Sequence, residues 1–115
     1  MTLDEISAFN ADWLKAWTDK DAARVASFYS DDCRYMDPNT AGGLQGNAVL
    51  RGYLDKMFAA APDMTYTPDE VWPIPGGFCG RWYADVQGGA RLRGFDFVLL
   101  KDGKIAHNEV YLHTL

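Results

Sequence analysis

The stretch Leu92-Arg93-Gly94-Phe95-Asp96-Phe97-Val98-Leu99-Leu100, followed at once by Lys101-Asp102-Gly103, decides the fold class. Its residues fall into two alternating series, as expected of a strand with one buried face. Asp-Gly is a strong signal for a tight hairpin turn, so a partner strand is expected from Lys104 to Leu115. This part of the chain is therefore predicted to be antiparallel sheet.

Two more strands are expected before this hairpin, one between Met64 and Ile74 and one from Phe78 to Val86. Pro75-Gly76-Gly77 and Gln87-Gly88-Gly89 separate the strands, since glycine accepts the backbone angles of tight turns. Four strands joined by short turns predict an antiparallel meander.

The N-terminal half instead repeats its apolar residues at helical spacing. A first helix is expected to start at the capping box Thr2-Leu3-Asp4-Glu5 and to end at Thr18-Asp19-Lys20. A shorter helix is expected from Asp21 to Tyr29, and a third from about Asn47 to Ala61.

The segment between the last two helices is predicted to form a short strand, Cys33 to Met36, and a glycine-rich loop, Asn39 to Gly46. Three helices followed by a meander predict one α+β domain over residues 1–115, with the helices on one face of the sheet. Because long antiparallel strands twist and curl, a sheet closed by helices is expected to hold a pocket.

The composition argues against several classes of function. The chain carries a formal net charge of −5 and its basic residues are scattered, which argues against a nucleic-acid partner. It shows no signal-peptide pattern and no apolar run of bilayer length, so a soluble, cytoplasmic protein without a membrane partner is expected. Cys33 and Cys79 are expected to be reduced core residues, and the clustered ligands of a zinc site are missing.

Two aspartates have positions that suggest chemistry. Asp96 is expected on the inner face of its strand, where an ionised carboxylate must either pair or take a raised pKa. A register shift of one residue would instead place Asp96 in solvent. Asp37, directly before Pro38, is either a turn residue or the partner of Asp96 in a pair made of a base and a hydrogen-bond donor.

A family resemblance rests on the segment Val25-Ala26-Ser27-Phe28-Tyr29-Ser30-Asp31-Asp32-Cys33-Arg34-Tyr35-Met36-Asp37-Pro38, with Gly46 and Asp102-Gly103-Lys104-Ile105. With its order of elements, the chain resembles the nuclear transport factor two-like superfamily, and within it the SnoaL-like polyketide cyclases and ketosteroid isomerases. The resemblance implies a cone-shaped fold, in which three N-terminal helices pack on a strongly curved antiparallel sheet that encloses a pocket. It also implies chemistry without a cofactor and a homodimer through the sheet face.

Residue by residue, the resemblance makes Asp37 the base that moves a proton between carbons, and Asp96 the neutral acid that stabilises the enolate. Tyr29 matches a pocket tyrosine found in some members, and Trp13 takes the place of the oxyanion tyrosine. An indole N–H donates a hydrogen bond but is not a phenolic acid. Asp96, with Tyr29 or Trp13, would then stabilise the oxyanion.

Aromatic residues around the expected pocket favour a small apolar or aromatic ligand, although each of them could equally fill the core. The pocket candidates, with one polar residue that the resemblance turns inward, are Trp13, Trp17, Tyr29, Tyr53, Phe58, Trp82 and Asn108. A second group shares the other face of the last strand, which the resemblance places outside the cone; it comprises His107, Glu109, Tyr111 and His113. An interface or a solvated face is expected there rather than a metal site, because strand neighbours two apart spread along the strand.

These observations predict a cofactor-independent enzyme that transfers protons on a small hydrophobic carbonyl compound, as an isomerase, cyclase or dehydratase. Two alternatives stay open. One is a non-catalytic pocket that binds an apolar molecule, and the other is a protein-interaction domain that uses the open sheet face.

Overall fold

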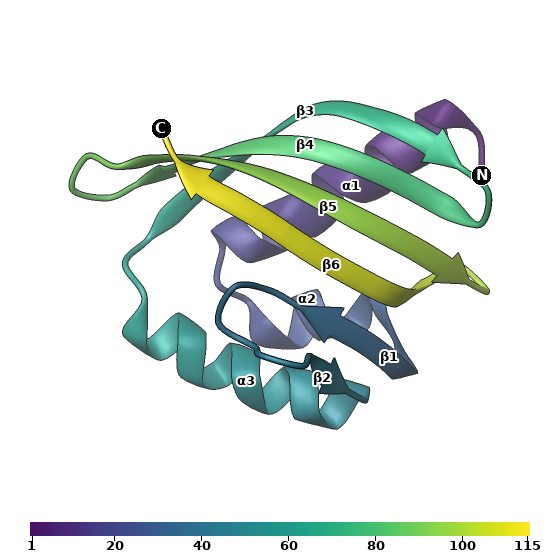
Figure 1. Ribbon diagram of the computed structural model, residues 1–115, viewed down its shortest axis with the longest axis horizontal. Coiled ribbons are helices and arrows are strands. Elements are labelled where there is room, and N and C mark those ends of the chain that lie inside the picture. The colour runs from purple at the N-terminus through teal and green to yellow at the C-terminus, as the bar shows by residue number, and fades with distance from the viewer.

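The computed structural model describes residues 1–115 and contains three helices and six strands (Figure 1). The α+β class and the three helices are therefore confirmed. In chain order the elements are α1 (Leu3–Thr18), α2 (Ala22–Ser27), β1 (Tyr29–Met36), β2 (Leu44–Gln45), α3 (Asn47–Ala60), β3 (Met64–Ile74), β4 (Gly77–Val86), β5 (Arg91–Lys101) and β6 (Lys104–Thr114).

All six strands belong to one sheet with the order β2-β1-β6-β5-β4-β3. The meander of β3 to β6 is antiparallel, but β1 pairs with β6 in parallel. The expectation of a purely antiparallel sheet was therefore wrong. A parallel pair needs a long crossover connection, and here everything between β1 and β6 supplies it.

The start of β1 also differs from the prediction, which continued the second helix to Tyr29. The helix ends at Ser27, and Tyr29 pairs with Ile105 of β6. The backbone N–H of Ile105 donates to the carbonyl of Phe28 at 2.8 Å. Pairing with a strand distant in sequence overrides the local helical spacing of apolar residues. In the same way, Leu44–Gln45 forms β2 inside the segment expected to be a loop.

The ends of the first two helices follow the sequence signals. Thr2 and Glu5 form the capping box of α1, and the Asp21 side chain accepts from the backbone N–H of Arg24 to cap α2. In the turn between β5 and β6, Asp102 and Gly103 have φ values of 52° and 76°. Positive φ at both central residues is what a tight hairpin turn requires.

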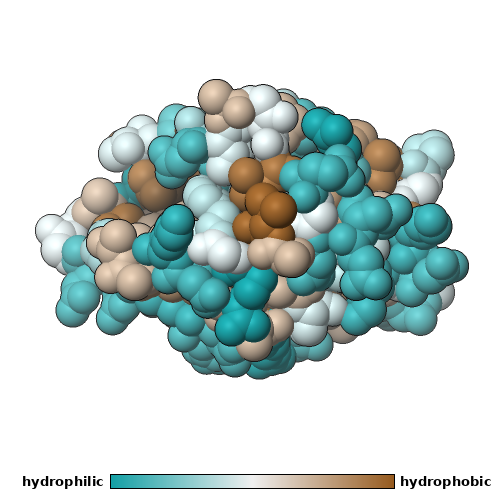
Figure 2. Space-filling view, turned by 90° about the horizontal axis from the view of Figure 1, so that it is seen from below, coloured by the Kyte–Doolittle hydropathy of each residue, from teal (hydrophilic) through white to brown (hydrophobic).

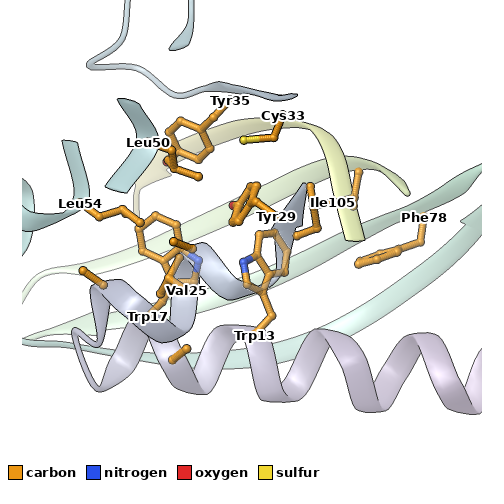
Figure 3. Packing of buried hydrophobic residues seen from close by; sticks show 14 of the residues in the cluster. Trp13, Trp17, Val25, Tyr29, Cys33, Tyr35, Leu50, Leu54, Phe78 and Ile105 are labelled. Carbon is orange, nitrogen blue, oxygen red and sulfur yellow. The ribbon is translucent and has the colours of Figure 1, made fainter. Parts of the chain in front are cut away.

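The main core lies between α1, the inner face of the sheet and α3. In Figure 3, Trp13 and Trp17 of α1 point toward Tyr29 and Tyr35 of β1, which are 3% and 2% exposed. The surface seen from below is mostly hydrophilic, with a small apolar patch near its centre (Figure 2). No helix has both the length and the apolar character needed to cross a membrane.

Candidate functional site

A cavity of about 290 Å³ lies between α1 and the inner face of the sheet. Its lining comes from α1, the end of β1, the end of α3 and strands β3 to β6, and 12 of the 16 lining residues are hydrophobic. Asp37 and Asp96 both belong to this lining. Two residues far apart in the sequence, each predicted to do chemistry, thus face one apolar space.

Asp96 lies on the inner face of β5, as its strand pattern predicted. Gly94, Asp96 and Val98 are buried, whereas Phe95 between them is exposed. The Asp96 side chain is 3% exposed and has no cationic partner. This is an uncommon environment for a carboxyl group.

Two buried N–H groups hold the Asp96 carboxyl. Nε1 of Trp82 donates to Oδ2 at 2.7 Å, and Nδ2 of Asn108 donates to Oδ1 at 3.1 Å. The Asn108 amide is itself oriented, because Nδ2 also faces the carbonyl of Phe97 and Oδ1 accepts from the Tyr29 hydroxyl at 2.8 Å. Burial raises the pKa of Asp96 to about 7, while the two donors lower it.

The consequence is a carboxyl group that exchanges protons near neutral pH. Each oxygen of Asp96 already accepts one N–H from the protein. An added proton therefore occupies a lone pair that neither donor uses, and it is free to contact a ligand in the cavity. A carboxyl of this kind is suited to general acid–base catalysis, since the best catalytic pKa lies near the working pH.

Asp37 follows directly after β1 and has a different environment. Its Oδ2 accepts from the hydroxyls of Tyr35 at 2.8 Å and Tyr53 at 2.5 Å, and its Oδ1 accepts from the backbone N–H of Asn39 at 2.8 Å. The backbone N–H of Asp37 donates to Oγ1 of Thr40 at 2.8 Å. Asp37 is thus both the turn residue and a cavity residue, so the two alternatives were not exclusive.

The remaining pocket candidates divide into two groups. Trp13, Trp17 and Trp82 line the cavity. Four others are not among the lining residues: Tyr29, Tyr53, Phe58 and Asn108. The three polar members support Asp37 and Asp96 through hydrogen bonds, whereas the Phe58 ring packs edge-on against Trp17 with a centroid distance of 5.5 Å.

Two tyrosines that line the cavity were not among the residues predicted from the sequence. Tyr35 lies two residues before Asp37 on β1, so alternation along the strand could have found it. Tyr66 of β3 packs against Trp82 with a ring-centroid distance of 5.0 Å, and its hydroxyl makes no hydrogen bond within the chain. Its pKa is raised by burial and further by the charges of Asp96 and Asp37. Tyr66 is thus a neutral phenol that feels both carboxylates.

The resemblance makes Trp13 a candidate oxyanion donor. Its indole N–H is fully covered by neighbouring atoms and has no hydrogen-bond acceptor. A ligand oxygen does not reach that nitrogen in this arrangement. Among the lining residues on the sheet, the Tyr66 hydroxyl is a donor without a partner in the chain, and Asp96 becomes a donor when protonated.

A glycine fixes the position of Trp82. A Cβ added at Gly94 would lie 2.1 Å from Cζ2 of Trp82. We expect Gly94→Ala to lower the free energy of unfolding by about 1–3 kcal/mol, because the buried indole must move and loosen its bond to Asp96. Urea unfolding measures this change. The matched control is Gly52→Ala in α3, where an added Cβ meets no atom within 4 Å. Equal losses in both variants would contradict the assignment.

The outer face of β6 carries its own polar network, away from the cavity. Nε2 of His107 lies 2.7 Å from Oε2 of Glu109, and the Tyr111 hydroxyl donates to the other oxygen at 2.6 Å. Nε2 of His113 lies 3.1 Å from the guanidinium of Arg93. No group of three His, Cys, Asp or Glu side chains is arranged to hold a metal ion. The homodimer through this face stays a prediction.

Residues 11–108 match the family model described as a SnoaL-like domain. Several solved structures share the fold at low sequence identity. One is a ketosteroid isomerase-like protein from Erwinia carotovora atroseptica SCRI1043, with 19% identity, 91% of each chain covered and a TM-score of 0.70. A second is SalBIII, an epoxide hydrolase/cyclase-like enzyme of pyran ring formation in salinomycin, with 17% identity, 96% and 92% covered and a TM-score of 0.77.

A third solved structure has a ketosteroid isomerase-like fold and comes from Catenulispora acidiphila DSM 44928, in complex with trimethylamine. It shares 15% identity, covers 90% of this chain and 83% of its own, and has a TM-score of 0.73. At these identities the likeness shows the fold alone. No protein of curated function is recognisably similar in sequence.

Proposed function

The chain belongs to the SnoaL-like domain family, and from this premise we propose that it is a cofactor-independent enzyme that transfers protons on a small hydrophobic carbonyl compound. The observation that supports this most is the pair of aspartates in one apolar cavity, each in a different environment. Two titratable groups whose surroundings differ in this way can divide the roles of base and acid between them.

In this proposal Asp37 is the base. Its carboxylate accepts a proton from the carbon next to the substrate carbonyl, through the lone pairs that Tyr35, Tyr53 and the Asn39 N–H leave free. Two phenols on Oδ2 leave Oδ1, with a single backbone donor, as the more available oxygen. The donors also fix the carboxylate in one orientation, which favours a productive approach.

Asp96 is the acid. In its protonated form it donates to the carbonyl oxygen as negative charge develops there, and the free Tyr66 hydroxyl gives a second donor. The electron pair of the C–H bond moves into the enol, and the proton resides on Asp37. Return of that proton to another carbon is isomerisation. In cyclisation the enol carbon attacks a second carbonyl, whose oxygen takes the proton from Asp37. In dehydration the β-hydroxyl takes that proton and leaves as water.

The comparisons support this reaction class only in a general way. Relatives of the same fold include an epoxide hydrolase/cyclase-like enzyme and a ketosteroid isomerase-like protein. The lining, with 12 hydrophobic residues of 16, favours an apolar substrate with few polar atoms.

The test is proton exchange in D₂O, because it requires only the first step and not knowledge of the product. A panel of cyclic and bicyclic ketones is incubated with the protein, and loss of the signals of protons next to the carbonyl is followed by NMR. We expect exchange that falls as the pH rises through about 7, since Asp96 must carry its proton to donate.

Exchange that rises as the pH rises through about 7 would instead assign the role of base to Asp96. If ketones bind without any exchange above the buffer rate, the proposal is wrong and the chain is a binding domain. If no ketone binds at all, the result favours the alternative of a protein-interaction domain that uses the open sheet face.

A further inference from the structure

The cavity lining carries negative charge that no basic residue balances. Asp37 and Asp96 are its two carboxyl groups, and no Lys, Arg or His side chain belongs to the 16 lining residues. The lining phenols of Tyr35 and Tyr66 stay neutral, because burial raises the pKa of both. A site of one sign with low-dielectric walls favours a ligand of the opposite charge.

One wall of this cavity is continuously aromatic. The rings of Tyr35 and Trp17 are stacked with a centroid distance of 6.3 Å, Trp17 and Tyr66 lie 6.1 Å apart, and Tyr66 and Trp82 lie 5.0 Å apart. All four residues belong to the lining. Aromatic faces attract cations through the ring quadrupole, most strongly where water is excluded.

The two ends of this wall are hydrogen-bonded to the two carboxyl groups. The Tyr35 hydroxyl donates to Asp37 at 2.8 Å, and Nε1 of Trp82 donates to Asp96 at 2.7 Å. The aromatic rings and the carboxylates of this wall therefore attract the same cation. A neutral ligand of the same shape would use only the apolar contact.

The hydrogen bonds also select the kind of cation. Each oxygen of Asp96 accepts one N–H, and Asp37 accepts three hydrogen bonds in total. With about four lone pairs on each carboxylate, roughly three stay free, and they are divided between two separate groups. A primary ammonium has three N–H donors and a guanidinium has five, so either one would leave donors unpaired unless it bonded both carboxylates at once. An ammonium that bears three or four carbon substituents needs one acceptor or none.

We propose that the cavity binds a tertiary or quaternary alkylammonium group, held against the faces of Trp17, Tyr66 and Trp82 between the two carboxylates. This proposal concerns binding alone and goes beyond the proton-transfer reaction. A ligand with such a group and an apolar arm suits the volume of about 290 Å³, near the lower end of small-molecule pockets.

Binding of this kind is coupled to the proton of Asp96. Its direct partners are Trp82 and Asn108, and the titratable groups that feel its charge are Tyr29, Tyr66 and Cys79, each with a raised pKa. Those groups are neutral near pH 7. A cation in the cavity favours ionised Asp96, so the complex should release a proton on formation.

The experiment compares choline with its neutral isostere, 3,3-dimethylbutan-1-ol, by calorimetry on the full chain. We expect choline to bind at least about tenfold more tightly at about pH 8, because only the cation gains from the rings and carboxylates. The ratio of the affinity for choline to the affinity for the neutral isostere should fall at least about threefold at about pH 5.5, where Asp96 is protonated. Wild-type protein in phosphate and in Tris should give different apparent enthalpies near pH 7, which reports the released proton.

Variants of lining residues test which side chains bind the cation. Tyr66→Leu should weaken choline more than it weakens the neutral isostere, because both ligands lose an apolar contact but only the cation loses the attraction of the ring. Asp96→Asn should remove the pH dependence, whereas Asp31→Asn, an exposed position outside the lining, removes the same charge and should change nothing. Equal affinity for both ligands, or a preference that survives Tyr66→Leu and Asp96→Asn, overturns the proposal. If the protein prefers choline but catalyses no ketone exchange, the proton-transfer proposal is wrong and the cation-binding proposal stands. If it catalyses ketone exchange but does not prefer choline, the cation-binding proposal is wrong and the proton-transfer proposal stands.

Discussion

Asp37→Asn is expected to lower kcat/KM for ketone proton exchange by about 100- to 10,000-fold, the usual contribution of a general base. The asparagine amide keeps the shape of the side chain and an oxygen for Tyr35 and Tyr53, but it has no lone pair basic enough to take a proton from carbon. The fold should survive, because β1 and its turn keep their backbone hydrogen bonds. Exchange rates measured by NMR, with circular dichroism as a check on folding, test this result.

The matched control is Asp102→Asn, which removes the same charge at the β5–β6 turn. Asp102 has φ of 52°, a conformation that asparagine tolerates well, and it lies outside the cavity lining. Its exchange rate should stay within about twofold of the wild type. If Asp37→Asn loses no more activity than this control, Asp37 is only the turn residue that its hydrogen bonds to Asn39 and Thr40 make it.

The second large effect is a loss of stability as the pH rises from about 4 to about 7. The pKa of Asp96 is about 7 in the folded chain, against 3.8 for an unperturbed aspartate. Below about pH 4 both states carry the proton, so the contribution to stability is fully present. Between the two values the folded chain keeps a proton that the unfolded chain releases, and unfolding becomes more favourable. The total amounts to roughly 4 kcal/mol by the standard conversion, as an order of magnitude.

Urea unfolding at a series of pH values measures this linkage. Other carboxyl groups also titrate in the acid range, so the informative quantity is the difference between the wild type and Asp96→Asn. The amide of Asp96→Asn does not titrate. The unfolding free energy of this variant should therefore vary less with pH, by the contribution of Asp96 given above, even if one hydrogen bond, to Trp82 or Asn108, is lost. Parallel curves for the two proteins would show that Asp96 exchanges no proton in this range.

The local signals in the sequence were sufficient for most of the elements. The capping box at Thr2 and Glu5 and the Asp-Gly turn at Asp102 are short-range features, and each satisfies its backbone groups with neighbours in the chain. The inward direction of Asp96 followed from strand alternation, which has a fixed period of two. Such features need no knowledge of distant residues.

Long-range pairing was not accessible in the same way. Tyr29 continues the helical spacing of α2, yet it belongs to β1 because Ile105, far along the chain, pairs with it. The parallel pairing of β1 with β6 has the same origin. Local propensity amounts to only fractions of a kcal/mol per residue, so hydrogen bonds to a distant strand decide the outcome.

For the site, too, some features follow from the local sequence and others depend on tertiary packing. By itself the sequence determined that Asp37 stands at the end of a strand, and it predicted that Asp96 faces inward, with a one-residue register shift as the open alternative. Only the tertiary structure decided that both line one cavity, that Tyr66 lies between Trp17 and Trp82, and that Tyr29, Tyr53 and Asn108 support the carboxyl groups from behind. The physical reason is that residue spacing fixes the direction of a side chain within its own element, whereas the packing of α1 and α3 against the sheet fixes which side chains meet.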